Sequence, residues 1–235
     1  MSCTRFQALL FDFFGTLVDS LSTSAHHDAV KAMGRRMGAP EEAFLEQWLR
    51  DYGARGSGRW PTVEDCVLHT CEAIGTNPDR ARASKAARIR SSFIEQALVL
   101  RPDARATLEA IKARGLKTGL ITDCPPELPA LWPALGLEQL IDAPIFSCVV
   151  KLRKPDPRIY QMACKRLGVR PGDCLFVGDG GSQELSGAEA VGMTAVCIRA
   201  ASEENYDPHR VDAETWHGPR ITSLGEILPY LDADE

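Results

Sequence analysis

The sequence lacks any hydrophobic run long enough to cross a membrane. None of its apolar stretches reaches the ~18 consecutive residues that a bilayer-spanning helix needs. The first five residues carry neither an apolar segment nor a small-residue cleavage site, so we expect no secretory signal. These absences predict a soluble protein without a membrane partner.

An excess of positive charge is also lacking. The chain has 27 Lys and Arg against 32 Asp and Glu, which gives a formal net charge of −5. Proteins that hold nucleic acid through their overall charge are strongly basic, so we expect no nucleic-acid partner. Hydrophobic residues make up 44% of the 235 residues and charged residues 25%, a mixture typical of globular proteins rather than of disordered chains.

No Cys-x-x-Cys pair occurs among the eight cysteines. Several of them, such as Cys148, Cys174 and Cys197, lie inside apolar segments. We therefore expect reduced, partly buried thiols and a cytoplasmic location.

Short apolar runs alternate with helix-like stretches along most of the chain. Runs that are apolar on both faces are typical of parallel strands covered by helices on both sides. The alternation predicts an α/β fold with a doubly wound parallel sheet. The expected strands are residues 8–11, 118–121, 145–149, 174–177 and 194–198, with a short helix over 221–231 and no assignment for 201–220.

The alternation fails between about Asp19 and Leu98, where apolar residues recur at helical spacing and no strand is evident. We interpret this region as an inserted helical cap domain, residues 20–95, that interrupts a core made of residues 1–19 and 96–235. Four helices are expected in the cap, and a glycine-rich stretch over 53–61 interrupts them.

Four polar motifs occur in order near the ends of the expected strands, where open α/β sheets bind their ligands. Read alone, each has an ordinary structural explanation, such as a helix-capping Asp or an exposed loop lysine. Together they supply a nucleophile, a hydroxyl group, a cation and carboxylates for a metal ion. The motifs are Asp12-Phe13-Phe14-Gly15-Thr16, Thr122-Asp123, Lys154-Pro155, and Gly178-Asp179-Gly180-Gly181 followed by Glu184.

This set resembles the haloacid dehalogenase-like (HAD) superfamily over nearly the whole chain, and the insertion resembles the helical cap of its C1 subgroup. The resemblance implies a hydrolase with a Rossmann-like core, acting on a small anionic molecule as a monomer or homodimer. It makes Asp12 the nucleophile, which would form an aspartyl intermediate. Thr122 would hydrogen-bond the transferred group, and Lys154 would neutralise charge on it and on the nucleophile.

A magnesium site and a binding site follow from the same resemblance. Mg²⁺ would be held by Asp12, Asp179 and the backbone carbonyl of Phe14. Glu184 stands where the family often has Asp, so it is either a further metal ligand or a residue that contacts the ligands without binding the metal. Thr16, which helps to position the first loop, and Asp123 are assigned to substrate binding.

Substrate choice is expected in the glycine-rich stretch of the cap. Arg55 and Arg59 are candidates to bind an anion, with Trp60 offering an aromatic face. The alternative is a solvated loop whose arginines meet only water. His26 and His27 lie early in the first cap helix, where one of them is a candidate proton donor for the reaction, although a surface position is the commoner role for histidine.

One departure from the family pattern leaves the reaction open. Phosphatases of the family carry a general acid, Asp, two residues after the nucleophile, and this chain has Phe14 there. General acid–base catalysis typically contributes about 10²–10⁴-fold, so a phosphatase without it needs a good leaving group or another proton donor. We favour a Mg²⁺-dependent phosphohydrolase because of Gly178-Asp179. One alternative is a metal-independent dehalogenase-type hydrolase, because the haloacid dehalogenases of the family carry an aromatic residue at the position of Phe14. The other is a catalytically weakened binding protein.

Overall fold

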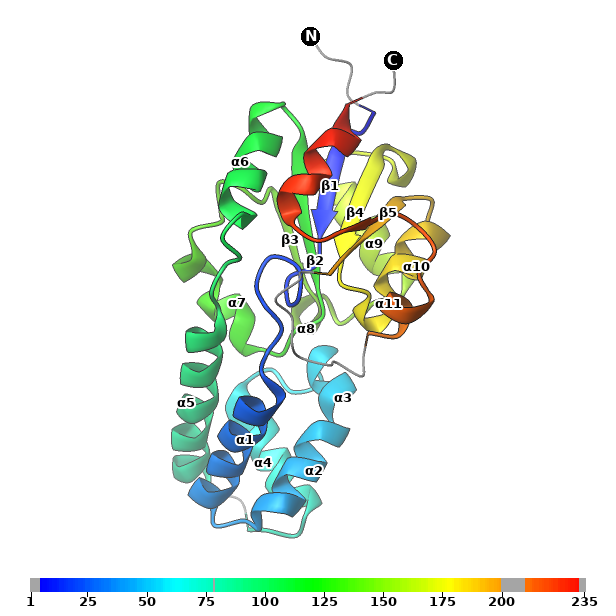
Figure 1. Ribbon diagram of the computed structural model, residues 1–235. Helices are drawn as coiled ribbons and strands as arrows, with labels where there is room; N and C mark the ends of the chain where they lie inside the picture. Colours follow the sequence, from blue (N-terminus) through cyan, green and yellow to red (C-terminus); the bar gives the residue numbers. More distant parts are fainter. Residues whose placement is uncertain (1–4, 78, 200–209, 233–235) are drawn as a thin grey trace.

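A parallel six-stranded sheet forms one end of the molecule in the computed structural model, which describes residues 5–77, 79–199 and 210–232 (Figure 1). The strand order is β3-β2-β1-β4-β5-β6, and every pairing is parallel. The doubly wound α/β fold expected from the sequence is therefore confirmed. The strands are β1 Ala8–Phe11, β2 Lys117–Thr122, β3 Ala143–Phe146, β4 Cys174–Gly178, β5 Thr194–Ile198 and β6 Arg220–Ile221.

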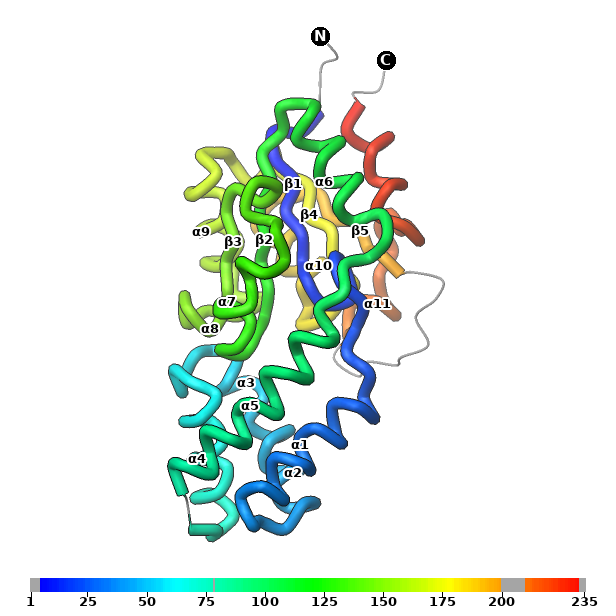
Figure 2. The backbone as a smooth tube through the Cα atoms, turned by 90° about the vertical axis from the view of Figure 1, so that its left-hand side faces the viewer, coloured from blue at the N-terminus to red at the C-terminus, as the bar shows by residue number. Residues whose placement is uncertain are grey.

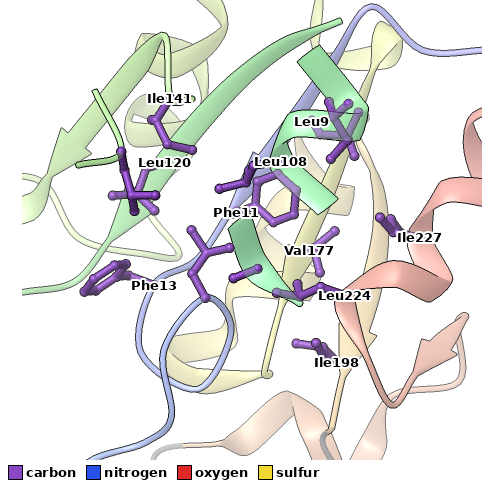
Figure 3. Packing of buried hydrophobic residues seen from close by; sticks show 14 of the residues in the cluster. Leu9, Phe11, Phe13, Leu108, Leu120, Ile141, Val177, Ile198, Leu224 and Ile227 are labelled. Carbon is purple, nitrogen blue, oxygen red and sulfur yellow. The ribbon is translucent and has the colours of Figure 1, made fainter. Parts of the chain in front are cut away.

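Helices cover both faces of the sheet because its central strands are apolar on both sides. In β1, Leu9 and Phe11 point to one face, where they pack in a cluster with Leu108 and Val177 (Figure 3). Ala8 and Leu10 point to the opposite face and join a second cluster. The helices that contribute to these clusters are α6 Ala104–Ala113, α9 Pro157–Leu167, α10 Glu184–Ala190 and the 3₁₀ helix η4 Leu224–Leu231.

Two parts of the core differ from the expected pattern. The strand expected over 145–149 ends at Phe146, and α8 (Ser147–Val150) follows at once. The buried Ser147 hydroxyl accepts a hydrogen bond from the Cys124 backbone N–H (2.9 Å) and donates one to the Gly56 carbonyl (2.6 Å), which draws the chain out of the sheet. Of the unassigned region 201–220, residues 201–209 lie outside the described residues, and the rest contains α11 (Val211–Thr215) and the start of β6.

A layer of helices lies beyond the carboxyl ends of the strands (Figure 1). Two segments that run side by side connect it to the sheet, and Val18 forms a β-bridge with Leu100 between them (Figure 2). The layer has its own hydrophobic cluster, which includes Met33, Phe44 and Trp48. These helices are α1 Thr23–Met37, α2 Glu41–Arg50, α3 Tyr52–Gly56, α4 Val63–Ala73 and α5 Arg80–Ala97; we keep 20–95 as the proposed extent of the cap.

The glycine-rich stretch contains α3 and packs closely against the core. Gly58 has a φ of +66°, and a Cβ at this position would lie 1.9 Å from the Cys148 carbonyl oxygen. The glycine therefore permits a close approach of two backbones. Short elements complete the described fold: α7 Glu127–Leu131, η1 Trp132–Leu135, η2 Pro171–Asp173 and η3 Gly181–Gln183.

Among the described residues, no helix combines the length and the apolar composition that crossing a bilayer requires.

Candidate active site

Asp12 lies at the carboxyl end of the central strand β1. Its backbone N–H donates to the Val177 carbonyl of β4 (2.9 Å), which extends the strand pairing to the site, and only 4% of the residue is exposed. Thr16 is buried beside it, with its Oγ1 3.5 Å from Asp12 Oδ2. Gly15 turns the chain with a φ of +81°, and a Cβ there would lie 2.1 Å from Asp179 Oδ2. The turn thus brings the first and fourth motifs into contact.

Lys154 joins two of the buried carboxylates. Its ammonium group donates to Asp12 Oδ1 and to Glu184 Oε2, and the lysine is 6% exposed. Burial alone would lower the pKa of Lys154, but the two carboxylates raise it well above its ordinary value. The lysine is therefore held in its charged form next to Asp12.

Asp123 holds the segment that carries this lysine. Its Oδ1 accepts the backbone N–H of Lys154 (3.1 Å), and its Oδ2 lies 3.2 Å from Nε of Arg153. Asp123, which the sequence assigns to substrate binding, also lines the cavity described below, so it faces both Lys154 and any bound molecule.

Three carboxylates converge at the ends of β1 and β4. One oxygen each from Asp12, Asp179 and Glu184 lies within 4.8 Å of the others. Glu184 is fully buried, and its Oε1 accepts the Gly180 N–H (3.0 Å). Arg210, which no sequence motif pointed to, lies with its Nε 2.6 Å from Asp179 Oδ2.

Negative charge exceeds positive charge in this cluster. Among the described residues, Lys154 and Arg210 are the basic groups paired with its three carboxylates. Burial raises the pKa of Asp12 to about 6, although Lys154 opposes the rise. Burial and the charge of Asp12 raise the pKa of Glu184 well above its ordinary value. Hard oxygen donors that are short of positive charge fit a divalent cation such as Mg²⁺.

Thr122 ends β2, the strand paired with β1, and it is fully buried and not among the residues that line the cavity described below. Among the described residues, no hydrogen-bond partner is found for its Oγ1. Leaving a buried hydroxyl unpaired costs about 1–3 kcal/mol, so an oxyanion bound near the end of β2 would relieve that cost.

A cavity of about 480 Å³ separates the strand ends from the helical layer. Asp12, Phe14, Asp179 and Glu184 line it from the sheet side. The helical side contributes a mixture of basic and apolar groups. It includes His26, His27, Leu49, Tyr52, Arg55, Arg90 and Ile94.

The two arginines expected to bind an anion lie in different places. Arg55 lines the cavity and is buried, with Nη1 donating to the Trp48 carbonyl and the guanidinium carbon 4.0 Å from the Trp48 ring centre. Arg59 is exposed, lies over Trp60 and does not line this cavity, so the structure does not bring it to the other candidate residues. The second arginine that lines the cavity is Arg90, which no feature of the sequence singled out.

His26 is unsuited to replace the missing general acid. Burial, with the nearby charges of Arg90 and Arg55, lowers its pKa to about 3. The imidazole is therefore neutral near pH 7 and carries no extra proton to give to a leaving group.

An open parallel sheet with polar and charged side chains gathered beyond its strand ends is typical of α/β proteins that bind ligands at this edge. Residues 6–192 match the family of haloacid dehalogenase-like hydrolases, and the chain belongs to this family. The chain is 31% identical to the (S)-2-haloacid dehalogenase 4A of Burkholderia cepacia, over 96% of this chain and 94% of the relative. It is 28% identical to the glyceraldehyde 3-phosphate phosphatase of Pyrococcus furiosus, over 98% and 95% of the two chains. It also resembles the crystal structure of a HAD phosphatase from Thermococcus onnurineus, with a TM-score of 0.64, 25% identity, and coverage of 94% of this chain and 95% of that one.

These relatives include both dehalogenases and phosphatases. Family membership therefore establishes a hydrolase, and the bond that it cleaves has to be argued from the site.

Proposed function

We propose that the protein is a Mg²⁺-dependent phosphohydrolase that uses Asp12 as its nucleophile and acts on a small anionic phosphate ester. The observation that carries this proposal is the convergence of Asp12, Asp179 and Glu184 to within 4.8 Å. Lys154 and Arg210 offset part of the negative charge, and a divalent cation would offset the rest.

The residues divide the reaction between them. Thr16 and Lys154 hold the two oxygens of Asp12, which keeps the carboxylate in one orientation. An Asp12 oxygen attacks phosphorus in line, and the bond from phosphorus to the ester oxygen breaks. Thr122 Oγ1 is available to donate to an oxygen of the transferring group, and Lys154 stabilises the charge that develops there. Water then hydrolyses the acyl phosphate, which regenerates Asp12 and releases inorganic phosphate.

A bound Mg²⁺ would act as a Lewis acid for the oxygens of the transferring group, with Asp12, Asp179, Glu184 and the Phe14 carbonyl as its candidate ligands.

Phe14 determines which esters react well. The phenyl ring lines the cavity where the family's phosphatases have an acid, and it cannot protonate a departing alkoxide. The leaving group therefore departs as an anion, and we expect a strong preference for esters of acidic alcohols or phenols.

The same residue favours a second candidate, a dehalogenase-type hydrolase without a metal. A halide leaves without a proton, so the ring at position 14 would cost nothing, and the (S)-2-haloacid dehalogenase relative is 31% identical. Asp12 would then displace halide from carbon, and water would hydrolyse the resulting ester.

One set of assays separates the candidates. Purified protein is given aryl and alkyl phosphates with Mg²⁺ or with a chelator, and (S)-2-haloacids with halide release as readout. The proposal expects phosphate release that disappears with the chelator and in Asp12→Asn. Halide release that the chelator leaves unchanged would overturn it in favour of the second candidate. Absence of both activities in folded protein would leave a binding protein.

A further inference from the structure

Two buried arginines line the helical side of the cavity, opposite the acidic cluster. Arg55 and Arg90 are each 4% exposed, and they come from α3 and α5. Charged side chains are rarely buried to this extent unless they have partners. A buried arginine whose N–H donors lack partners within the protein would therefore point to a bound ligand.

Within the described ranges, Arg90 has one ionic partner and one unused donor. Its Nε lies 2.7 Å from Glu127 Oε1, and both side chains of this pair are buried. For Arg90 Nη1, which is also buried, no hydrogen-bond partner is found in the described part of the chain. A guanidinium offers several N–H donors in a fixed plane. The pairing of Nε with Glu127 therefore leaves the N–H donors of Nη1 available to a ligand.

A second unused polar atom belongs to a neighbouring side chain of the cavity wall. No partner among the described residues is found for the buried Nε2 of His26. His26 stacks on Phe93, with ring centres 6.0 Å apart, and the Arg90 guanidinium carbon lies 5.5 Å from the centre of that same ring. The two unpaired nitrogens thus belong to one packed group that faces the cavity.

The charges of this group favour an acceptor with a single negative charge. Arg55 and Arg90 together carry two positive charges, and Glu127 balances one of them. Burial lowers the pKa of Arg55 only to about 10, so it remains charged at neutral pH. The remaining charge matches a carboxylate better than the two negative charges of a phosphate monoester, and a carboxylate also fits the planar fork of Arg.

We propose that Arg90, assisted by Arg55, binds a carboxylate at the far end of the substrate, so that the protein acts on small phosphate esters of hydroxy acids. The phosphate part of this statement rests on the proposed phosphohydrolase function, whereas the carboxylate site rests on Arg55, Arg90 and the charge of Glu127. A cavity of about 480 Å³ has room for a short ligand that spans from Asp12 to Arg90. The substrate thus meets positive groups at both ends, through Lys154 at one and through Arg90 at the other.

Binding of non-hydrolysable analogues tests the site without turnover. Phosphonoacetate and its longer homologues are compared by calorimetry with alkylphosphonates of the same chain length, in buffer with Mg²⁺. A hydrogen bond to a buried charged group typically contributes enough to change affinity about tenfold to a hundredfold. We expect wild-type protein to bind the best phosphonocarboxylate at least about tenfold more tightly than its matched alkylphosphonate.

Variants assign this preference to Arg90. Because Arg90→Gln leaves Glu127 buried without its partner, the variant used is Arg90→Gln with Glu127→Gln, which removes both charges. The preference should disappear in this variant and persist in Arg88→Gln, which replaces an exposed arginine of the same helix. An unchanged preference in the double variant, or none in wild type, would overturn the proposal. Tighter binding of bisphosphonates than of phosphonocarboxylates would overturn the choice of a carboxylate.

The carboxylate site and the phosphohydrolase function fail in distinguishable ways. Simple monocarboxylates that bind in an Arg90-dependent manner to a protein that binds no phosphonate would support the carboxylate site and count against phosphoryl chemistry. Equal binding of all phosphonates would overturn the carboxylate site and leave the phosphohydrolase function standing.

Discussion

Nε of Arg210 lies 2.6 Å from Oδ2 of Asp179, so a built-in cation occupies one oxygen of a candidate metal ligand. The same guanidinium donates to the Ser20 hydroxyl, which fixes it in this position. An arginine that competes for a carboxylate oxygen weakens the attraction of that carboxylate for a metal ion.

Removing this competitor should strengthen metal binding. We expect Arg210→Gln to bind Mg²⁺ about tenfold more tightly than wild type by calorimetry, because a charge that repels the ion is lost. Arg199→Gln, at an exposed position directly after β5, is the control. Weaker binding in Arg210→Gln would mean instead that Arg210 orients Asp179 for the metal.

Lys154 is expected to stabilise the fold as well as the reaction. Lys154→Met leaves Asp12 and Glu184 buried without their cation, which typically costs about 3–5 kcal/mol. Urea denaturation measures the loss. Adding Glu184→Gln removes one of the stranded charges and should recover part of the stability; a double variant no more stable than Lys154→Met would contradict this account.

Phe14→Asp tests the expected dependence on the leaving group. In wild type, kcat/KM should fall steeply from aryl to alkyl phosphates, because Phe14 cannot protonate the leaving oxygen. The variant should flatten this dependence by speeding up the alkyl esters, by up to about 10²-fold. If a well-folded variant keeps the wild-type slope, the missing acid does not limit the rate.

Acid should destabilise the protein partly through His26. Its pKa is lowered to about 3 in the folded protein from an ordinary 6.5, so the unfolded chain binds the proton more readily. The free energy of unfolding should therefore decrease as pH falls from about 6.5, by at most about 1.4 kcal/mol per pH unit from this group. His26→Gln should show a shallower decrease between pH 6 and pH 4, measured by chemical denaturation at each pH. Identical slopes would refute the assignment.

Gly58→Ala should disturb the contact between α3 and α8. A Cβ at this position would lie 1.9 Å from the Cys148 carbonyl oxygen, so the backbone must shift. Gly75 is the matched control: its φ is a similar +71°, and no atom of the described residues lies within 4 Å of the place that a Cβ would take. We expect a loss of about 1 kcal/mol for Gly75→Ala from backbone strain and at least about 2 kcal/mol for Gly58→Ala. Equal losses would show that the contact contributes nothing.

The sequence predicted the sheet well because buried parallel strands carry a local signal. β1 and β5 begin and end at the expected residues. The strand expected over 145–149 begins earlier, at Ala143, and ends at Phe146, where the hydrogen bonds of Ser147 to backbone groups distant in sequence turn the chain. No local pattern contains that information.

The candidate site, like the sheet, was predictable from the sequence only in part. Asp12, Lys154, Asp179 and Glu184 stand in motifs of recognisable order, and the structure brings them together. The helical side carries no such motif. Whether Arg59 or another arginine of that layer faces the cavity depends on how the helices rotate and pack, which spacing along the chain does not encode.

The ion pair between Arg90 and Glu127 crosses from α5 to α7, and this has a consequence for chimaeric proteins. Grafting the helical insertion onto another core of the same family would carry Arg90 along and leave Glu127 behind. A buried arginine would then face a foreign surface without its counter-charge. We therefore expect the insertion and α7 to be exchanged successfully only together, so that hybrids that keep this ion pair are the ones that fold.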